Sequence, residues 1–341
     1  MATLSTGAMT LQDWAKRIDP KGKIDKTVEL LSQTNEVLTD MMWMEGNLPT
    51  GHRVTQRTGL PSVYWRMMNA GVPTSKSTTA QIDEGIGQLE AWSEVDKSIA
   101  ELNGNVNDTR MSEAMAFLEA MNQESASTLF YGSNANPEEY VGFSPRYSDL
   151  SAANAQNILD AGGSGSDNSS IWLCGWGSNE IFGVFPKGSK AGITHENLGL
   201  VTVETTAGVA GNRMRAYQDH WEWKQGLVVK DWRYAVRIPN IDISDLVGQT
   251  GTQALTAATS ITKLMSRAID RLPRLTGVKP VFYANRTILS HLRVIAQEKS
   301  SSAVTIQEAT NQFGQTIFET RFLGIPVRLV DALIQTEARV V

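Results

Sequence analysis

Apolar side chains recur at three- and four-residue steps in several segments, and this spacing predicts amphipathic helices. The longest of these segments is Asp108–Gly132, where Asn107 or Asp108 provides an N-cap and Gly132 suits a left-handed C-terminal position. The same spacing predicts helices over Asp25–Glu45 and Thr256–Leu272, and a further helix capped by Asn285. A helical stripe of methionines, as in Asp108–Gly132, is typical of packing rather than of a cofactor site.

Alternating apolar and polar residues predict strands, most clearly over Leu227–Ile238. Five apolar residues share one face of this predicted strand: Val228, Trp232, Tyr234, Val236 and Ile238. Shorter strand-like runs are Ile171–Leu173, Ile181–Phe185, Leu200–Thr205, Val281–Tyr283 and Phe318–Val330. Because helices and strands do not alternate regularly, the pattern indicates an α+β fold rather than a doubly wound sheet.

Charge changes sharply between two adjacent blocks. Residues 46–82 are rich in Gly, Pro and Thr and contain four basic and no acidic residues, whereas residues 83–130 contain ten acidic and two basic ones. The local charges are therefore +4 and −8. The switch indicates either a pair of surfaces that attract each other or an exposed hairpin beside an acidic helical face. A β-like patch, Val63–Trp65, lies within the basic block between Pro61 and Pro73.

Composition excludes several classes of protein. The 341 residues carry a formal charge of −5, which argues against a dedicated nucleic-acid-binding domain. Nine Trp and nine Phe with 20% charged residues exclude a largely disordered chain. The single cysteine, Cys174, allows no intrachain disulfide and favours a reducing compartment. The sequence has no 18-residue apolar run, so we expect no membrane span.

Motifs for catalysis and cofactor binding are missing. The nearest approach to a phosphate loop, Gly183–Lys190, has misplaced lysines and an internal proline, and no dinucleotide fingerprint follows a strand. Nucleophile-elbow and EF-hand patterns are absent. The histidines are too far apart in sequence for helical metal-ligand spacing: His52, His195, His220 and His291. We therefore predict no enzymatic turnover, no metal and no cofactor.

Two other features allow a structural and a functional interpretation. The tryptophans form two clusters, which indicate either core or subunit interface, or a platform that stacks on carbohydrate; they are Trp172 with Trp176, and Trp221, Trp223 and Trp232. The basic stripe on the predicted helix near Thr256–Leu272 is either a solvated face or a phosphate contact; it comprises Lys263, Arg267, Arg271 and Arg274.

The order of elements resembles that of tailed-phage major capsid proteins of the Hong Kong 97 type (the HK97-like fold). A helical arm leads into a basic extended loop, then a long helix, then a mixed region that closes on a Gly-Ile-Pro strand. Four segments carry the closer resemblance: YVGFSPRY at 140–147, FGVFPKGSKAGI at 182–193, WKQGLVVKDWRYAVRIPNIDISDL at 223–246, and FLGIPV at 322–327. These segments are structural in character, and with the element order they extend the resemblance over nearly the whole chain.

The resemblance implies a division of the chain into named parts. Residues 1–49 correspond to an N-terminal arm, 50–85 to an extended β-hairpin loop, and 86–225 to a P-domain with a spine helix at 108–131 and an inserted β subdomain. Residues 226–315 correspond to a central A-domain, and 316–341 to a strand that returns to the P-domain.

The resemblance also implies a function. We expect a structural protein whose copies form pentamers and hexamers of an icosahedral shell around double-stranded DNA. The shell would contact the DNA weakly and without sequence preference. Scaffolding, portal and decoration proteins are the expected partners, the virion is the expected location, and assembly would occur in the host cytoplasm. Two alternatives are an encapsulin-like compartment shell and a carbohydrate-binding phage protein that uses the Trp clusters.

Inter-subunit contacts are predicted at two sets of residues. The extended loop of one subunit would attract the acidic block of its neighbour, through Arg53, Arg57, Arg66 and Lys76 on one side and Glu113, Glu119 and Glu124 on the other. Apolar residues of the arm would pack against a spine helix of the same or a neighbouring subunit, and these are Leu31, Leu38, Met41 and Trp43.

Overall fold

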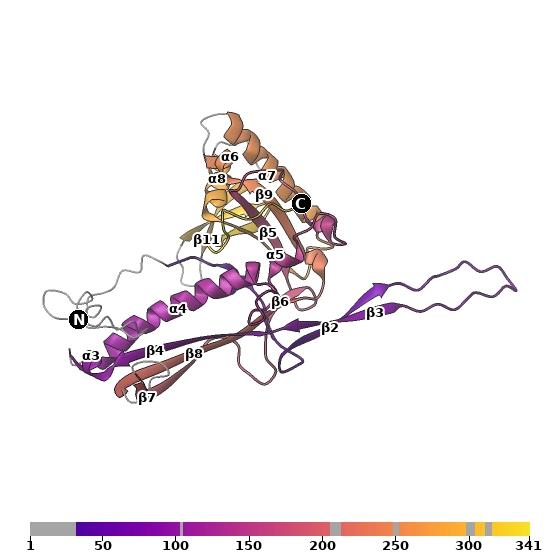
Figure 1. Cartoon of the computed structure of the whole chain (residues 1–341). Coiled ribbons are helices and arrows are strands. Elements are labelled where there is room, and N and C mark those ends of the chain that lie inside the picture. Colours follow the sequence, from indigo (N-terminus) through magenta and orange to yellow (C-terminus); the bar gives the residue numbers. More distant parts are fainter. Residues whose placement is uncertain (1–31, 103–104, 205–212, 248–251, 298–303, 311–315) are drawn as a thin grey trace. The chain divides into compact units, whose positions relative to one another are not determined.

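The structure is a computed structural model that describes residues 32–102, 105–204, 213–247, 252–297, 304–310 and 316–341 (Figure 1). The chain forms two compact units. Unit 1 contains Gln88–Ser125 and Gly192–Lys224, and unit 2 contains Thr34–Gly87, Ala126–Ala191 and Gln225–Val341. Helix α4 and strand β8 contribute residues to both units.

Unit 2 is built on a mixed sheet in which β11, β12, β13, β10, β5, β6 and the end of β8 follow one another. Strand β9 also pairs with β5, and β1 pairs with β6. These strands are β1 (Trp43–Glu45), β5 (Asn168–Trp176), β6 (Ile181–Phe185), β8 (Arg213–Val229), β9 (Ala235–Asp242), β10 (Lys279–Ala284), β11 (Val304–Thr310), β12 (Thr316–Phe322) and β13 (Ile325–Leu329). The helices of this unit are α2 (Val37–Asp40), α5 (Phe143–Arg146), α6 (Ile243–Val247), α7 (Thr252–Arg271) and α8 (Arg286–Gln297), with short 3-10 turns at Ala155–Asn157 and Trp232–Tyr234.

The core of unit 2 is aromatic and centred on β5, all of whose nine residues are buried. Trp172 contacts the rings of Phe130, Phe143 and Tyr147 at centroid separations of 5.6–6.1 Å. The indole N–H of Trp176 donates a hydrogen bond of 2.7 Å to the hydroxyl of Tyr283. Burial of these rings contributes much of the hydrophobic stabilisation of the unit.

A charged pair is buried in the same core. The guanidinium of Arg237 lies 2.8 Å from the Glu337 carboxylate and over the ring of Trp172, and it donates to the carbonyl oxygen of Tyr147. Glu337 also accepts hydrogen bonds from Ser170 and from the hydroxyl of Tyr131. Because the last residues of the chain supply this carboxylate, they fasten the C-terminal segment into the core.

The described part of unit 1 contains residues of three strands and two helices. Strand β8 pairs with β4 (Gly87–Asp96) and with β7 (Thr194–Glu204), and the helices are α3 (Lys97–Glu101) and α4 (Val106–Tyr131). On the face toward α4, the ring of Trp221 stacks on Phe117 and on His195. Asp219, on the same face, accepts hydrogen bonds from Arg110 of α4 and lies 2.9 Å from His195.

Most of the predicted helices and several strands are confirmed. Helices α4 and α7 cover the predicted segments within a few residues at each end, and Asn285 caps α8 by accepting from the backbone N–H of Ile288 at 2.9 Å. Strands β5, β6 and β10 contain the predicted short runs, and β7 contains the run from Leu200 up to Glu204, while Thr205 lies outside the described residues. The Trp clusters are core residues: Trp172, Trp176, Trp221 and Trp223 are buried and Trp232 packs against the core, so they do not form an exposed carbohydrate platform.

Three predictions of local structure are wrong. Of the helix expected over Asp25–Glu45, residues 25–31 lie outside the described residues and only Val37–Asp40 is helical in the rest; Trp43–Glu45 instead forms β1, which pairs in parallel with β6. The strand expected over Leu227–Ile238 is broken, because the Asp231 carboxylate accepts from the backbone N–H of Arg233 and starts a 3-10 turn. Val63–Trp65 is extended without a strand partner.

Candidate functional site

A long hairpin of unit 2 carries the charged loop found in the sequence. Strands β2 (Gly51–Gly59) and β3 (Thr78–Gly85) pair antiparallel from Gly51 opposite Gly85 outward, with an irregularity near Gly59. Beyond them the chain continues as two extended segments to a turn in which Ala70 donates its N–H to the carbonyl of Met67 (Figure 1). Asn69 has a φ of 63°, a left-handed conformation that asparagine tolerates in turns.

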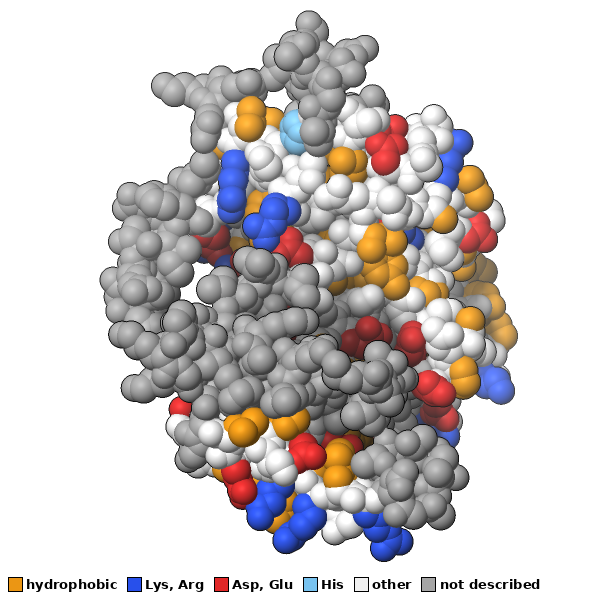
Figure 2. Space-filling view, turned by 60° about the vertical axis from the view of Figure 1, so that its left-hand side comes forward, with side chains coloured by type: hydrophobic (Ala, Val, Ile, Leu, Met, Phe, Trp, Pro, Cys, Tyr) orange, Lys and Arg blue, Asp and Glu red, His pale blue; other side chains and the backbone are white. Residues whose placement is uncertain are grey.

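The outer part of this hairpin, residues 60–77, exposes apolar side chains and is called the tip below. Val63 is 89% exposed, Met68 is 94% exposed and Trp65 is fully exposed. Leu60, Tyr64, Met67 and Val72 are exposed as well. On the face shown in Figure 2, by contrast, apolar side chains are dispersed among acidic and basic ones. Contiguous exposed apolar residues mark an interaction surface, whereas isolated ones are ordinary.

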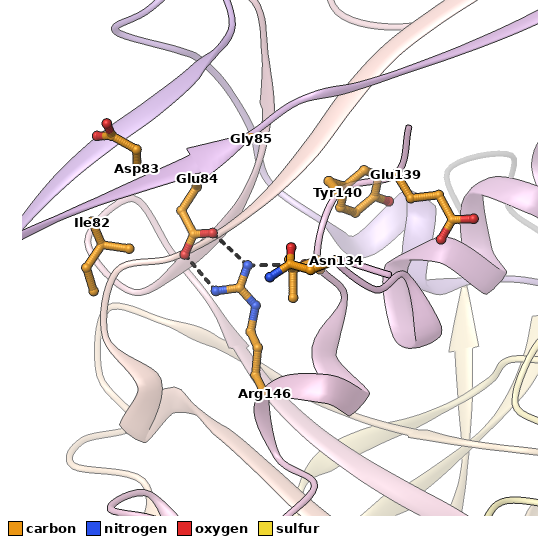
Figure 3. Close-up of a pocket in the computed structure, with 9 residues that line it drawn as sticks. Ile82, Asp83, Glu84, Gly85, Asn134, Glu139, Tyr140 and Arg146 are labelled. Atoms are coloured by element: carbon orange, nitrogen blue, oxygen red, sulfur yellow. Dashed lines mark hydrogen bonds and ion pairs between the residues drawn. The ribbon is translucent and has the colours of Figure 1, made fainter. Parts of the chain in front are cut away.

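The base of the hairpin is fixed within unit 2 by an ion pair. Both terminal nitrogens of Arg146 on α5 lie 2.6 Å from the two carboxylate oxygens of Glu84 on β3, a bidentate geometry (Figure 3). Arg146 also donates to the carbonyl oxygens of Val141 and Gly142. Glu84 is 7% exposed, so this pair is largely shielded from water.

Apolar packing holds the other strand of the base. Val54 of β2 is buried in a small cluster with Phe182, Val184 and Val228, and His52 contacts the ring of Phe182 edge-on. Burial and the nearby Lys230 lower the pKa of His52. The hairpin therefore has a rigid base and a tip that makes no such packing.

A pocket of about 320 Å³ lies beside the base (Figure 3). Its lining comes from the end of β3, from the loop after α4 and from α5, and comprises Ile82, Asp83, Glu84, Gly85, Asn134, Glu139, Tyr140, Val141 and Arg146. Glu84 and Arg146 point toward each other, and the Glu139 carboxylate is directed away from them. Glu139 accepts a hydrogen bond from Asn136, and no cation pairs with it in the described part of the chain. The pocket thus combines apolar walls with an acidic rim.

The predicted basic contact residues all lie on this hairpin, but their surroundings differ. Arg53 is paired with Asp83 on the facing strand at 2.6 Å, and this bond lowers the pKa of Asp83. Arg57, Arg66 and Lys76 are exposed on the strand and the tip. Arg53 therefore has an acidic partner in its own chain that lies just outside the acid-free block.

The predicted acidic contact residues lie on α4. Glu124 is exposed, and Glu113 is half-buried. Glu119 accepts hydrogen bonds of 2.8 Å from the backbone N–H of Gln33 and from the side chain of Gln123.

The predicted apolar contacts of the arm lie mainly in the chain's own core. Met41 is buried, and Leu38 and Trp43 are partly buried against the core of unit 2. Trp43 and Met41 fill the space above Gly183 of β6, where a Cβ would lie 2.8 Å from the Trp43 ring. Leu31 lies outside the described residues. Met41 and Trp43 therefore pack against β6, and Met41 belongs to the same core cluster as Leu129 and Phe130 of α4.

Sequence reasoning missed the Arg146–Glu84 pair and the pocket. Arg146 lies within the YVGFSPRY segment, but its partner is 62 residues away and nothing in either segment indicates the pairing. The apolar tip had a visible signal, because Val63–Met68 contains five large apolar residues in a stretch bounded by prolines.

Neither metal ligands nor a membrane helix is found among the described residues. In the ranges that the structure describes, no group of three or more His, Cys, Asp or Glu residues has a geometry that could hold a metal ion. No described helix is long and apolar enough to cross a membrane. Cys174 is fully buried, and burial raises the pKa of its thiol.

Comparison with known proteins assigns the chain to a family. The family model of major capsid protein GP7 matches residues 19–341. The chain belongs to this family. It is a structural protein of a bacteriophage capsid shell, and this family membership favours a phage capsid over an encapsulin-like compartment.

Solved structures agree with this assignment. A chain in the structure of bacteriophage Epsilon15 is 30% identical to the capsid protein, with a TM-score of 0.75 and coverage of 99% of each chain. The α+β fold is therefore that of the Hong Kong 97 type. No curated protein matched the sequence.

Two more distant structures were also found. The bacteriophage JBD30 capsid shows 10% identity and a TM-score of 0.48, over 89% of this chain and 93% of the other. The SrpI encapsulin complex from Synechococcus elongatus shows 13% identity and a TM-score of 0.45, over 72% and 99%.

Proposed function

We propose that the hairpin of this capsid protein makes the contacts that join neighbouring subunits into capsomers. The observation that carries this proposal is the exposed tip: seven large apolar side chains that are about half to fully exposed, together with Arg66 and Lys76 and no acidic residue. Apolar surface of this kind is stabilised when a partner covers it. In a protein that builds a shell, the most abundant partner is another copy of the same chain.

Opposite charge would give these contacts a direction. Arg57, Arg66 and Lys76 of one subunit would attract the acidic block of the next, including Glu113, Glu119 and Glu124. A single exposed ion pair contributes only about 0–1 kcal/mol and is screened by salt. The contribution becomes significant by repetition, because every subunit of a closed ring makes the same contact.

The wider assembly follows from the same proposal. Residues 1–49 act as the arm, 50–85 as the extended loop, 86–225 as the P-domain, 226–315 as the A-domain and 316–341 as the return strand. Pentamers and hexamers form an icosahedral shell around double-stranded DNA, which the acidic protein (formal charge −5) confines without binding tightly. Scaffolding, portal and decoration proteins join this shell during assembly in the host cytoplasm. The protein acts without enzymatic turnover.

Charge reversal of the hairpin tests the proposal. The triple variant Arg57→Glu, Arg66→Glu, Lys76→Glu should fail to form particles at low salt, as seen by negative-stain microscopy and sedimentation. A compensating change of Glu113, Glu119 and Glu124 to Lys should restore part of the assembly. Arg53 is left unchanged because its partner is Asp83 of the same hairpin.

The test compares the particle yield of the triple variant with that of wild type over a range of salt concentrations. A loss of assembly at low salt that weakens as salt rises supports an electrostatic contact. Wild-type yields from the triple variant at every salt concentration would show that the hairpin charges are only solvated. Circular dichroism of the unassembled variant serves as the folding control.

A further inference from the structure

The tip cannot be covered by the base of its own hairpin. About fifteen extended residues separate His52 at the base from Met67 at the turn, and at about 3.3 Å per residue they span roughly 50 Å. Strands β2 and β3 are paired along the first part of this length, so the hairpin does not fold back on itself there. A surface that covers the tip must therefore lie elsewhere than on the base of the same hairpin.

The pocket at the base is complementary to the tip, because both have apolar side chains while the tip is basic and the rim of the pocket is acidic. The tip offers Trp65 and neighbouring apolar residues with the cations Arg66 and Lys76. The pocket offers the Tyr140 side chain, Ile82 and Val141 as apolar wall, and Glu139 at the rim without a cationic partner in the described part of the chain. Glu84 and Arg146 neutralise each other, so the rim remains acidic.

The size of the pocket also suits an anchor of one or two side chains. Its volume of about 320 Å³ lies at the lower end of the roughly 300–1,000 Å³ that is typical of ligand sites. Aromatic residues inserted into such pockets often dominate the affinity of an interface. Trp65, fully exposed and adjacent to Arg66, is the side chain of the tip best suited to this role.

We infer that the pocket beside Glu84 and Arg146 receives the hairpin tip of a second copy of this chain, with Trp65 against Tyr140 and Arg66 facing Glu139. The inference rests on the proposed hairpin contact between subunits and differs from it at one residue, because the partner of Arg66 is here Glu139 and not a carboxylate of α4. Tip and pocket lie at opposite ends of one hairpin, so the contact is heterologous: each copy gives its tip to one neighbour and accepts the tip of another. Contacts of this kind generate closed rings when the rotation closes.

Disulfide trapping tests the contact directly. The pair Met68→Cys and Asn134→Cys places one thiol on the tip and one on the lining of the pocket without altering a charge. Met68→Cys with Met115→Cys, an exposed position on α4, is the matched control. The native Cys174 is buried and should not react. We expect a ladder of cross-linked oligomers on non-reducing gels, at least about tenfold stronger for the first pair.

Charge exchange gives an independent measurement. Glu139→Lys should raise the protein concentration needed for half-maximal assembly by about tenfold, and Trp65→Ala should raise it by at least as much. The double variant Arg66→Glu, Glu139→Lys restores opposite charges and should need a lower concentration than Glu139→Lys alone. Glu196→Lys, an exposed position on β7 outside both the acidic block and the pocket, makes the same change in net charge and should leave assembly unchanged.

The outcomes separate this inference from the proposed function. If Met68→Cys cross-links to Met115→Cys but not to Asn134→Cys in assembled particles, the tip docks elsewhere and the inference fails while the hairpin contact stands. If neither pair cross-links and Glu139→Lys and the tip variants assemble like wild type, both fail. Cross-linking of the pocket pair together with rescue by the charge exchange supports both.

Discussion

Two regions of unit 2 depart from the usual division between buried apolar and exposed charged residues, and they do so in opposite ways. The core buries a charged pair, Arg237 and Glu337, each about 3–4% exposed, whereas the hairpin tip exposes Trp65 and Met68. Both arrangements are unfavourable unless something compensates for them.

The difference lies in where the compensation is found. Arg237 receives it within the chain, from Glu337, Ser170, the carbonyl of Tyr147 and the ring of Trp172. The apolar residues of the tip receive none within the described chain, so their compensation must come from outside it. We therefore expect the core to determine whether the subunit folds, and we propose that the tip determines whether subunits associate.

The largest expected effect is on the core pair. Glu337→Ala would leave the Arg237 guanidinium buried without its counter-charge and should lower the free energy of unfolding by about 3–5 kcal/mol. Chemical denaturation of the unassembled subunit measures this loss. Glu101→Ala removes a carboxylate from an exposed pair and should change stability little. A similar loss of unfolding free energy in both variants would show that the buried pair matters no more for stability than an exposed one.

The hairpin base lies between the two extremes. Arg146→Met would leave Glu84 shielded and unpaired, and because Arg146 is partly exposed we expect a loss of about 2–3 kcal/mol. Hydrogen exchange should be faster mainly in β2 and β3. Arg53→Met breaks the exposed pair on the same hairpin and should have no measurable effect on exchange. Equal effects of the two changes would refute the view that the base is held by Arg146.

Much of the fold could be predicted from local pattern, because local forces decide it. The helix α4 follows from its apolar spacing and its terminal glycine, and α8 follows from its cap Asn285. The position of the hairpin could be inferred from the prolines and glycines of residues 46–82 and from the lack of any acidic residue in that segment. The resemblance to capsid proteins rested on four segments that the family match now covers.

What could not be predicted depends on distant parts of the chain. Trp43–Glu45 has helical spacing but forms a strand, because Gly183 leaves room for the Trp43 ring beside β6. The break after Val229 depends on the carboxylate of Asp231, which accepts hydrogen bonds from the backbone N–H and the guanidinium of Arg233. Glu337 is 100 residues from Arg237 and Glu84 is 62 from Arg146, and no periodicity encodes such pairs.

Acid should weaken unit 1 through Asp219. Burial raises the pKa of this carboxyl, but hydrogen bonds from Arg110 and His195 outweigh it, so the pKa lies below its ordinary value of 3.8. A carboxyl with a lowered pKa stabilises the fold above its unfolded value, and that stabilisation is lost as pH falls through the folded value.

The test compares two proteins across the acid range. Below about pH 5 the thermal midpoint of wild type should fall more steeply than that of Asp219→Asn, which has no carboxyl to titrate. Above that pH the variant should be less stable by a nearly constant amount. Parallel curves throughout would contradict the role given to Asp219. The effect is expected to be smaller than that of Arg146→Met, because His195 is about half exposed to solvent.

The smallest expected effect is at the tip. Trp65→Ala should change the unfolding free energy of the unassembled subunit by no more than about 0.5 kcal/mol, because a fully exposed side chain loses no packing in its own chain. The same substitution should strongly reduce particle formation, whereas Trp65→Phe, which keeps an aromatic ring, should reduce it less. Denaturation and particle yield measured on one preparation separate the two properties. If Trp65→Ala lowered subunit stability by as much as Arg146→Met, the tip would be part of the fold, and the distinction between a region that folds the chain and one that assembles it would not hold.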